Sequence, residues 1–213
     1  HTFTPQDTLP TGLSLEVAKD VLSHLHSGCK VASLGMQFAQ NELMEVTANI
    51  IGRETTSIAR TPRVYTDGQI VVANNVTWSW NGVNQNVISG DLTIENPLTR
   101  RNFVNSRYTS EPLPNGKRRV TGSFMVEFED AVIYSDFRNA TERVMVVTVT
   151  GDTIVGAYAY ELLMTMNVTE LQDAFPAADT EGPLTMSIPF EGFINSGNTS
   201  EITMRMTNEN SAV

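Results

Sequence analysis

Cysteine is almost absent from this sequence: Cys29 is the only one in 213 residues, so no internal disulfide can stabilise the chain. That usage suits synthesis in a reducing compartment. Long apolar runs are missing as well, because no stretch approaches the roughly 20 apolar residues that a membrane-spanning helix needs. Neither a glycine-rich phosphate loop nor a dinucleotide-binding fingerprint occurs. With 40% hydrophobic residues, the chain is long enough and apolar enough to fold around its own core.

Basic residues are also scarce, since 14 Lys and Arg stand against 24 Asp and Glu, for a net charge of −10. The charge is segregated along the chain: residues 1–52 carry a net −3, residues 53–119 a net +4 and residues 120–213 a net −11. A dedicated nucleic-acid binder is usually basic as a whole, so that class is disfavoured. Two interpretations stay open. Surfaces of opposite sign could meet between copies of this chain, or an acidic surface could simply carry one basic loop.

The start of the chain reads like mid-domain sequence. It begins with "HTFTPQDTLPTG", with His1 in place of a Met, and no charged-then-apolar leader opens it. We therefore expect a processed chain or a fragment.

Apolar and polar residues alternate along most of the chain, as is typical of half-buried β-strands. In "VASLGMQF" and "LMEVTANIIG" the apolar residues fall on one face of each run, and the short polar segment "AQNE" separates the runs. We predict a long antiparallel hairpin over residues 31–52. The alternation recurs in "GLSLEV", "NVTWSWNG", "ISGDLTIEN", "RRVTGSFMVEFE" and four later segments.

One segment breaks this pattern. In "EDAVIYSDFRNATER" the apolar residues Val132, Ile133 and Phe137 recur near helical spacing after two acids, which predicts a short amphipathic helix at about 129–140. One helix among so many strands predicts an all-β fold, an antiparallel β-sandwich or barrel, as a single domain over residues 1–213. Two long loops are expected, at about 53–68 and 97–117. Long connections without structure of their own are uncommon in compact domains and tend to be functional.

The stretch "SHLHSGCK" could begin a metal or thiol site, because it brings His24, His26 and Cys29 close together. Tetrahedral zinc needs three or four ligands, and a Cys–His nucleophile needs an exposed sulfur and a base held by a third group. Cys29 instead leads directly into the alternating run 31–38, where a small half-buried residue is usual. We favour a structural role and predict no metal, no cofactor and no catalytic residue.

Two further pairs could carry a function. Glu127 and Glu129 are neighbours on one strand face, but nothing gives the two carboxylates the different environments that a glycosidase needs. Trp78 and Trp80 also share a face, and alternating aromatics usually pack a core. If they were instead an exposed platform, the alternative function would be a monomeric β-sandwich carbohydrate-binding or adhesin module.

Four stretches, taken in order, resemble the tail tube proteins of long-tailed (siphovirus-type) bacteriophages. They are "TGLSLEV", "GCKVASLGMQFAQNELMEVTANIIGRE", "NSRYTSEPLPNGKRRVTGSFMVEFEDAVIYSDF" and "EGPLTMSIPFEGFIN". The second stretch is similar to the family's long hairpin, which begins with Gly-Cys-Lys-Val and ends with Ile-Gly-Lys/Arg. The third is similar to the family's loop, Val-x-Gly strand and helix, and the fourth to its closing strands. The matches spread from about residue 9 to 208. Because the family normally has residues before "HTFTPQDTLP", the resemblance implies that the N-terminal part is lacking here.

The resemblance implies a structural virion protein of the phage tail, not an enzyme. Six copies would form a ring, and stacked rings would form a tube that conducts double-stranded DNA during genome ejection without binding it specifically. Other expected partners are the tape measure, the tail terminator and the baseplate or tip, with assembly in the host cytoplasm and no membrane span.

Two groups of charged residues then become candidates. A lumen of carboxylates would repel DNA phosphates, and the candidates are the polar-face acids Glu42, Glu45, Asp91, Glu95, Glu127 and Glu129. The basic loop would dock on a neighbouring subunit or on the next ring, because most acids lie elsewhere in the chain. Its candidates are Arg100, Arg101, Arg107, Lys117, Arg118 and Arg119.

Overall fold

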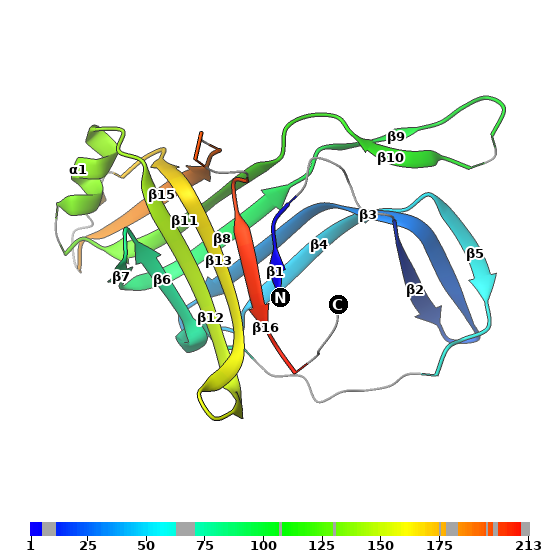
Figure 1. The fold of residues 1–213 in the computed structure, drawn as a ribbon, viewed down its shortest axis with the longest axis horizontal. Coiled ribbons are helices and arrows are strands. Elements are labelled where there is room, and N and C mark those ends of the chain that lie inside the picture. The colour runs from blue at the N-terminus through cyan, green and yellow to red at the C-terminus, as the bar shows by residue number, and fades with distance from the viewer. Residues whose placement is uncertain are drawn as a thin grey trace.

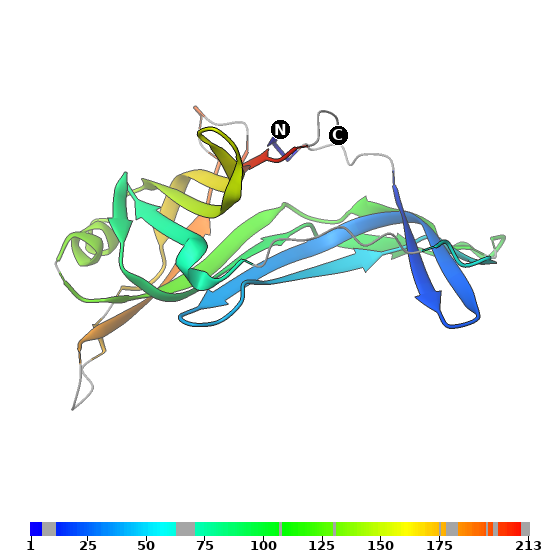
Figure 2. The ribbon, with the colours of Figure 1, turned by 90° about the horizontal axis from the view of Figure 1, so that it is seen from below.

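The computed structural model describes residues 1–5, 12–62, 71–106, 108–129, 131–174, 176–177, 183–194, 196–197 and 200–209. Within them the chain forms antiparallel strands, one α-helix, α1 (Val132–Arg138), and one 3₁₀ turn, η1 (Ala73–Asn75) (Figure 1). The predicted all-β class with one short helix is therefore confirmed. The molecule is elongated, with α1 at one end and a group of strands projecting at the other (Figure 2).

One layer is an antiparallel sheet in the order β4-β3-β8-β11-β15. Its strands are β4 (Glu45–Ile51), β3 (Leu22–Ala39), β8 (Val87–Glu95), β11 (Arg119–Glu127) and β15 (Thr185–Gly192). Gly35 of β3 lies opposite both Thr47 and Thr93, and successive residues alternate between two faces. The hairpin predicted over 31–52 is confirmed as the second half of β3 with β4.

The second layer continues the same sheet. It contains β13 (Tyr158–Leu171), β12 (Arg143–Val155), β6 (Val76–Trp80) and β7 (Val83–Gln85), with β16 (Thr203–Thr207) and β1 (Thr2–Phe3) beyond β13. β13 also pairs with β15 through Thr169–Leu171, which joins the two layers at one side. The short β14 (Pro176–Ala177) pairs with β15.

The core fills the space between the layers and is centred on Trp78, which is 2% exposed. The rings of Phe38, Phe124 and Phe190 surround it, with centroids 5.6, 4.9 and 5.7 Å from that of Trp78. These distances are in the range where aromatic pairs attract each other. Gly90 makes room for them, because a Cβ there would lie 2.8 Å from Phe38 and 2.9 Å from Trp78.

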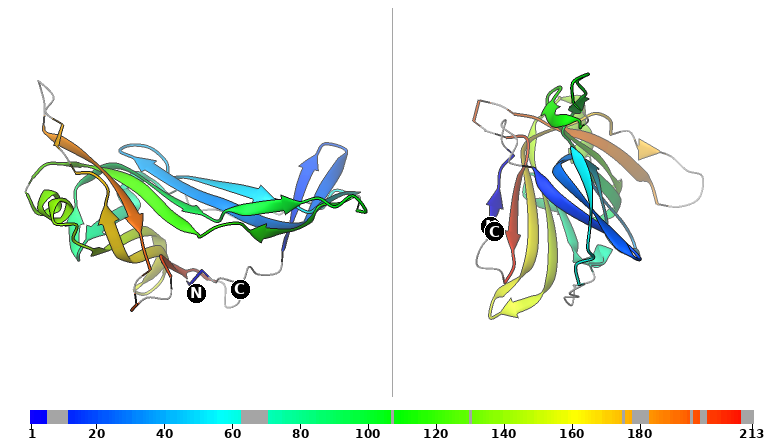
Figure 3. Two further views of the ribbon diagram at one scale, coloured as in Figure 1. Left: turned by 90° about the horizontal axis from the view of Figure 1, so that it is seen from above. Right: turned by 90° about the vertical axis from the view of Figure 1, so that its right-hand side faces the viewer.

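The first half of β3 leaves the sandwich and forms a three-stranded arm with β2 (Leu13–Lys19) and β5 (Glu54–Ile58). The strand changes partners near Gly28, whose φ of +61° is a conformation that other residues rarely adopt. The stretch "SHLHSGCK" therefore lies inside one long strand. The arm lies at the end of the molecule opposite α1 (Figure 3, left).

The prediction of a long loop without structure of its own at 97–117 is wrong in part. The segment forms a second, two-stranded sheet, β9 (Leu98–Arg101) with β10 (Ser110–Pro114). The ribbon covers no core, so apolar and polar residues do not alternate in its sequence. Pro112 and Pro114 also make β10 hard to recognise as a strand. Prolines are tolerated there because a two-stranded ribbon consists only of edges.

Two other expectations are corrected in extent. The first part of the predicted loop 53–68 is strand β5, while residues 63–70 lie outside the described part of the chain. The predicted helix at 129–140 is confirmed but shorter, as α1. Of its expected apolar face, Ile133 is buried whereas Val132 is 57% exposed, and the acid Asp136 is buried as well.

Candidate assembly surfaces

One face of the sheet β4-β3-β8-β11-β15 is polar along its length, and we call it the polar face. Two rows of cross-strand neighbours define it: Glu45, Gln37, Asp91 and Ser123 in one, and Asn49, Ser33, Glu95 and Arg119 in the other. Hydrogen bonds run along the rows, from Ser123 Oγ to Asp91 and, at 2.7 Å, from Asn49 Nδ2 to Ser33 Oγ. Three of the acids predicted to line a channel, Glu45, Asp91 and Glu95, thus lie together.

The other three predicted acids lie towards the end that carries α1. Glu42 is in the turn after β3, Glu127 is the last residue of β11, and Glu129 accepts a 2.8 Å hydrogen bond from Asn86 Nδ2. Glu127 shares the polar face by alternation with Ser123. It also lines a hollow of about 500 Å³ between the ends of β3, β6, β8 and β11. We call this the end hollow; Gln40, Ala73, Trp78, Asn86 and Ile88 also line it.

The predicted basic residues divide into two groups. Arg118 and Arg119 are bound within the chain: Arg118 lies 2.8 Å from Glu201, and Arg119 donates to both carboxylate oxygens of Glu191 at 3.0 and 3.1 Å. The acids for these two come from distant parts of the same chain, and their contact with a second subunit stays a prediction. Arg100, Arg101 and Lys117 are exposed, and Arg107 lies outside the described residues.

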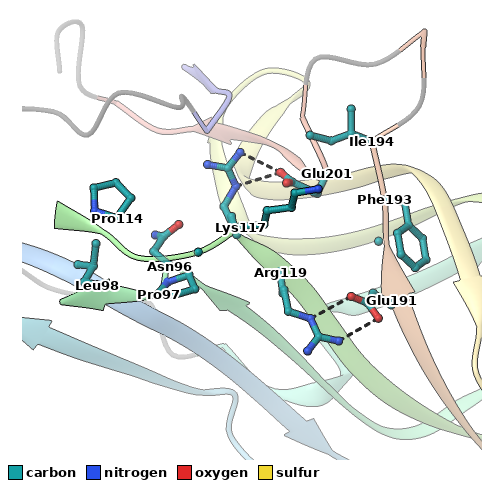
Figure 4. Close-up of a pocket in the computed structure, with 13 residues that line it drawn as sticks. Asn96, Pro97, Leu98, Pro114, Lys117, Arg119, Glu191, Phe193, Ile194 and Glu201 are labelled. Atoms are coloured by element: carbon teal, nitrogen blue, oxygen red, sulfur yellow. Dashed lines mark hydrogen bonds and ion pairs between the residues drawn. The ribbon is translucent and has the colours of Figure 1, made fainter.

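The two ion pairs cross a groove of about 820 Å³ at the base of the β9–β10 ribbon (Figure 4). Pro97, Leu98 and Pro114 form one wall, and Phe193 and Ile194 form the other. The hydrogen bonds to Glu191 raise the pKa of Arg119, with a further contribution from the charge of that carboxylate. Arg119 therefore stays charged, and Glu191 compensates its charge.

Two contacts attach the β9–β10 ribbon to β3 and to the segment between β4 and β5. Lys30 of β3, 8% exposed, lies 2.7 Å from the carboxylate of Glu111 on β10, and Thr109 Oγ1 donates to the carbonyl of Arg53 at 2.9 Å. The hydrogen bond and charge of Lys30 lower the pKa of Glu111. A ribbon of two strands is marginally stable alone, so these contacts hold its direction. The sequence carried no local signal for them, because 81 positions separate the two partners of the ion pair.

The arm exposes a row of apolar side chains. Leu13, Leu15 and Val17 share one face of β2, as the alternation indicated, but they are 59, 41 and 38% exposed rather than part of the core. Glu16, on the other face, accepts hydrogen bonds from Thr61, which lower its pKa.

One buried acid fixes α1 to the second layer. Asp136 accepts a 2.9 Å hydrogen bond from Trp80 Nε1 and pairs with Arg143 at 2.9 Å. The hydrogen bonds and charge of Asp136 raise the pKa of Arg143. Trp80, like Trp78, is 2% exposed, which confirms the core interpretation of this pair and contradicts the alternative of an exposed platform.

The three side chains of "SHLHSGCK" do not converge. His26 Nδ1 is 2.8 Å from Thr55 Oγ1, and buried Cys29 donates weakly to the carbonyl of His26. Across the described ranges, no group of three His, Cys, Asp or Glu side chains is placed to hold a metal ion. In the same part of the chain, no helix has the length and apolarity needed to cross a membrane.

A β-sandwich with a polar sheet face, a projecting arm and charged ends is an architecture that suits a structural protein. The comparisons agree. The family described as phage tail tube protein matches residues 1–192, and this chain belongs to that family, which makes it a non-enzymatic component of the virion tail. Its members assemble with themselves and with other tail proteins.

A solved structure gives the same fold. The chain is similar to the tube-terminating cap of the anti-feeding prophage, seen by cryo-electron microscopy, with a TM-score of 0.50 and 9% identity over 70% of this chain and 100% of that one. At that identity the likeness concerns the fold alone. Among curated proteins there is no match.

Proposed function

We propose that this chain is the major subunit of a phage tail tube, in which six copies close into a ring and stacked rings form a channel for double-stranded DNA. Residues 1–213 would act as one tube-forming domain, assembled in the host cytoplasm. The tape measure, the tail terminator and the baseplate or tip would be its partners in the tail. The observation that carries the proposal is the polar face, on which Glu45 of β4 and Asp91 and Glu95 of β8 lie together.

Open strand edges support closure into a ring. Among the described residues β4 pairs with β3 alone, which leaves its other edge free to pair. An exposed edge is a template for another strand, and a barrel of such sheets removes the edges altogether. A barrel closed with the polar face inward would place Glu45, Asp91 and Glu95 towards its bore.

The chemistry of that face suits DNA that must slide without binding. Each Lys or Arg side chain that neutralises a DNA phosphate releases counterions and adds affinity, whereas carboxylates add none. Arg119 is a basic residue on this face, and its guanidinium already donates two hydrogen bonds to the carboxylate of Glu191. Its charge is therefore offset before DNA arrives.

Electron microscopy of the purified chain tests this function. We expect rings of six and tubes, with the polar face on the bore in a cryo-EM map. A chain that stays monomeric at every concentration contradicts the proposal, and so does a tube whose bore is formed by another surface.

A further inference from the structure

The β9–β10 ribbon ends in a tip that is apolar, basic and exposed. Phe103 is 50% exposed, Val104 is fully exposed, and Arg100 and Arg101 lie beside them. We call these four residues the ribbon tip. Exposed apolar groups next to charges are typical of contact surfaces rather than of solvated loops.

The ribbon tip has an ordered local structure. The Arg101 guanidinium lies over the Phe103 ring, 5.8 Å from its centroid, and the Ser106 amide donates to the Phe103 carbonyl at 3.1 Å. Ser106 Oγ also donates to the Tyr108 carbonyl at 2.8 Å. Together with the Lys30–Glu111 pair at the base, these contacts fix the direction of the tip, and Arg100 also lines a hollow beside Val17 and His26 of the arm. Less conformational entropy is then lost when the tip binds.

The end hollow is also partly apolar, but its charged residue is an acid. Its floor contains Phe38 and Trp78, Glu127 lines it, and Asn86 in its wall holds Glu129. Glu42 is adjacent, since its carbonyl accepts from the amide of Ala73 in the same wall. No Lys or Arg is among the described residues that line it. A volume of about 500 Å³ is within the range of cavities that bind ligands, roughly 300–1,000 Å³.

The β9–β10 ribbon and the strands β6 and β7, whose residues line the end hollow, lie at opposite ends of the molecule (Figures 1 and 3). The ribbon tip and the end hollow therefore cannot meet within one chain. We propose that the ribbon tip of one copy docks in the end hollow of a second copy, with Phe103 and Val104 in the hollow and Arg100 and Arg101 against Glu127 and Glu129. Such a contact is heterologous, because the two surfaces differ, and it therefore propagates from copy to copy. It rests on the proposed self-assembly and assigns Glu127 and Glu129 to a contact rather than to the channel.

Charge reversal at each surface tests the contact. Variant T carries Arg100→Glu and Arg101→Glu, and variant H carries Glu127→Arg and Glu129→Arg; all four side chains are exposed, so both variants should fold. Like charges would then face each other, and we expect the sedimenting assembled fraction of either variant alone to fall by roughly tenfold or more. The loss should be partly reversed at high salt.

An equimolar mixture of T and H is the decisive sample. The acidic tip of T fits the basic hollow of H, and the basic tip of H fits the acidic hollow of T, so assembly should return. Both variants keep a net negative charge, and general attraction between them cannot explain a rescue. Lys19→Glu with Arg60→Glu is the matched control, with the same charge change on the exposed arm, and its mixture with H should show no rescue.

The outcomes separate the two proposals. A wild-type chain that never assembles contradicts the proposed function and this contact with it. Wild-type tubes together with T and H tubes of the same yield contradict the contact alone, as does a T–H mixture that assembles no better than its components. Loss of rings and loss of stacking between intact rings both support it.

Discussion

At the scale of single residues, Asp136 connects the helix to the core. Replacing it with Ala leaves the buried Trp80 Nε1–H without an acceptor, which we expect to cost about 1–3 kcal/mol of unfolding free energy. Urea unfolding of the unassembled chain would measure this. In a Trp80→Phe background the same replacement should cost less, because the donor is already gone. Equal costs in both backgrounds would show that the hydrogen bond does not stabilise the fold.

Residue alternation predicted which side chains share a face but not which distant ones pair. The shared face of Glu45, Asp91 and Glu95 follows from period-two patterning, because every second residue of a strand points to the same side of the sheet. The partners of Arg118 and Arg119 lie 83 and 72 positions away, and no local pattern contains that information. For the same reason the basic loop looked like a free docking surface in the sequence.

At the scale of elements, the ion pair at the base of the ribbon makes its attachment pH-dependent. Lys30 lowers the pKa of Glu111 in the folded chain, so the pair stabilises the attachment at pH above the unfolded value of about 4.3 and loses this as pH falls through the folded value. We expect a carbon-detected NMR titration of the Glu111 carboxyl to give a midpoint below the ordinary one. In Lys30→Met the midpoint should rise to the ordinary range. An ordinary midpoint in the wild type would rule out the pair in solution.

Elements that bury a face were predictable, and elements that bury none were not. The second half of β3 repeats apolar residues every second position because Met36 and Phe38 pack in the core around Trp78. Its partner β4 alternates as well, although Val46 and Ile50 are exposed. The β9–β10 ribbon faces no core, so its sequence resembles that of a loop. The arm shows the opposite error, since the apolar row of β2 alternates like a core strand although the structure leaves it exposed. Alternation indicates an apolar face but not which molecule covers it.

At the scale of the whole molecule, charge is sorted by surface. The ribbon tip is basic, Glu127 lines the end hollow, and the polar face carries the acids Glu45, Asp91 and Glu95. The segregation found in the sequence therefore fits surfaces that meet between copies better than uniform acidic solvation. The two acidic surfaces have different proposed roles, because one would receive a basic tip and the other would repel phosphate.

The role of the polar face is tested by making it basic. Glu45→Lys with Glu95→Lys changes two exposed side chains, and we expect tubes that retain short duplex DNA in co-sedimentation at low salt, whereas wild-type tubes release it. Retention should weaken as salt rises, with a log–log slope that steepens by about 0.9 for each phosphate that is neutralised.

Glu142→Lys with Asp152→Lys is the matched control, because it makes the same charge change at exposed positions just before and within β12, in the second layer. If tubes of this control retain as much DNA as the polar-face variant, retention reflects net charge rather than position. The polar face would then not be the surface that DNA passes. Retention by the polar-face variant alone would instead place Glu45 and Glu95 at the bore. Two Glu→Lys substitutions in each copy would then be enough to turn a wall that repels DNA into one that binds it.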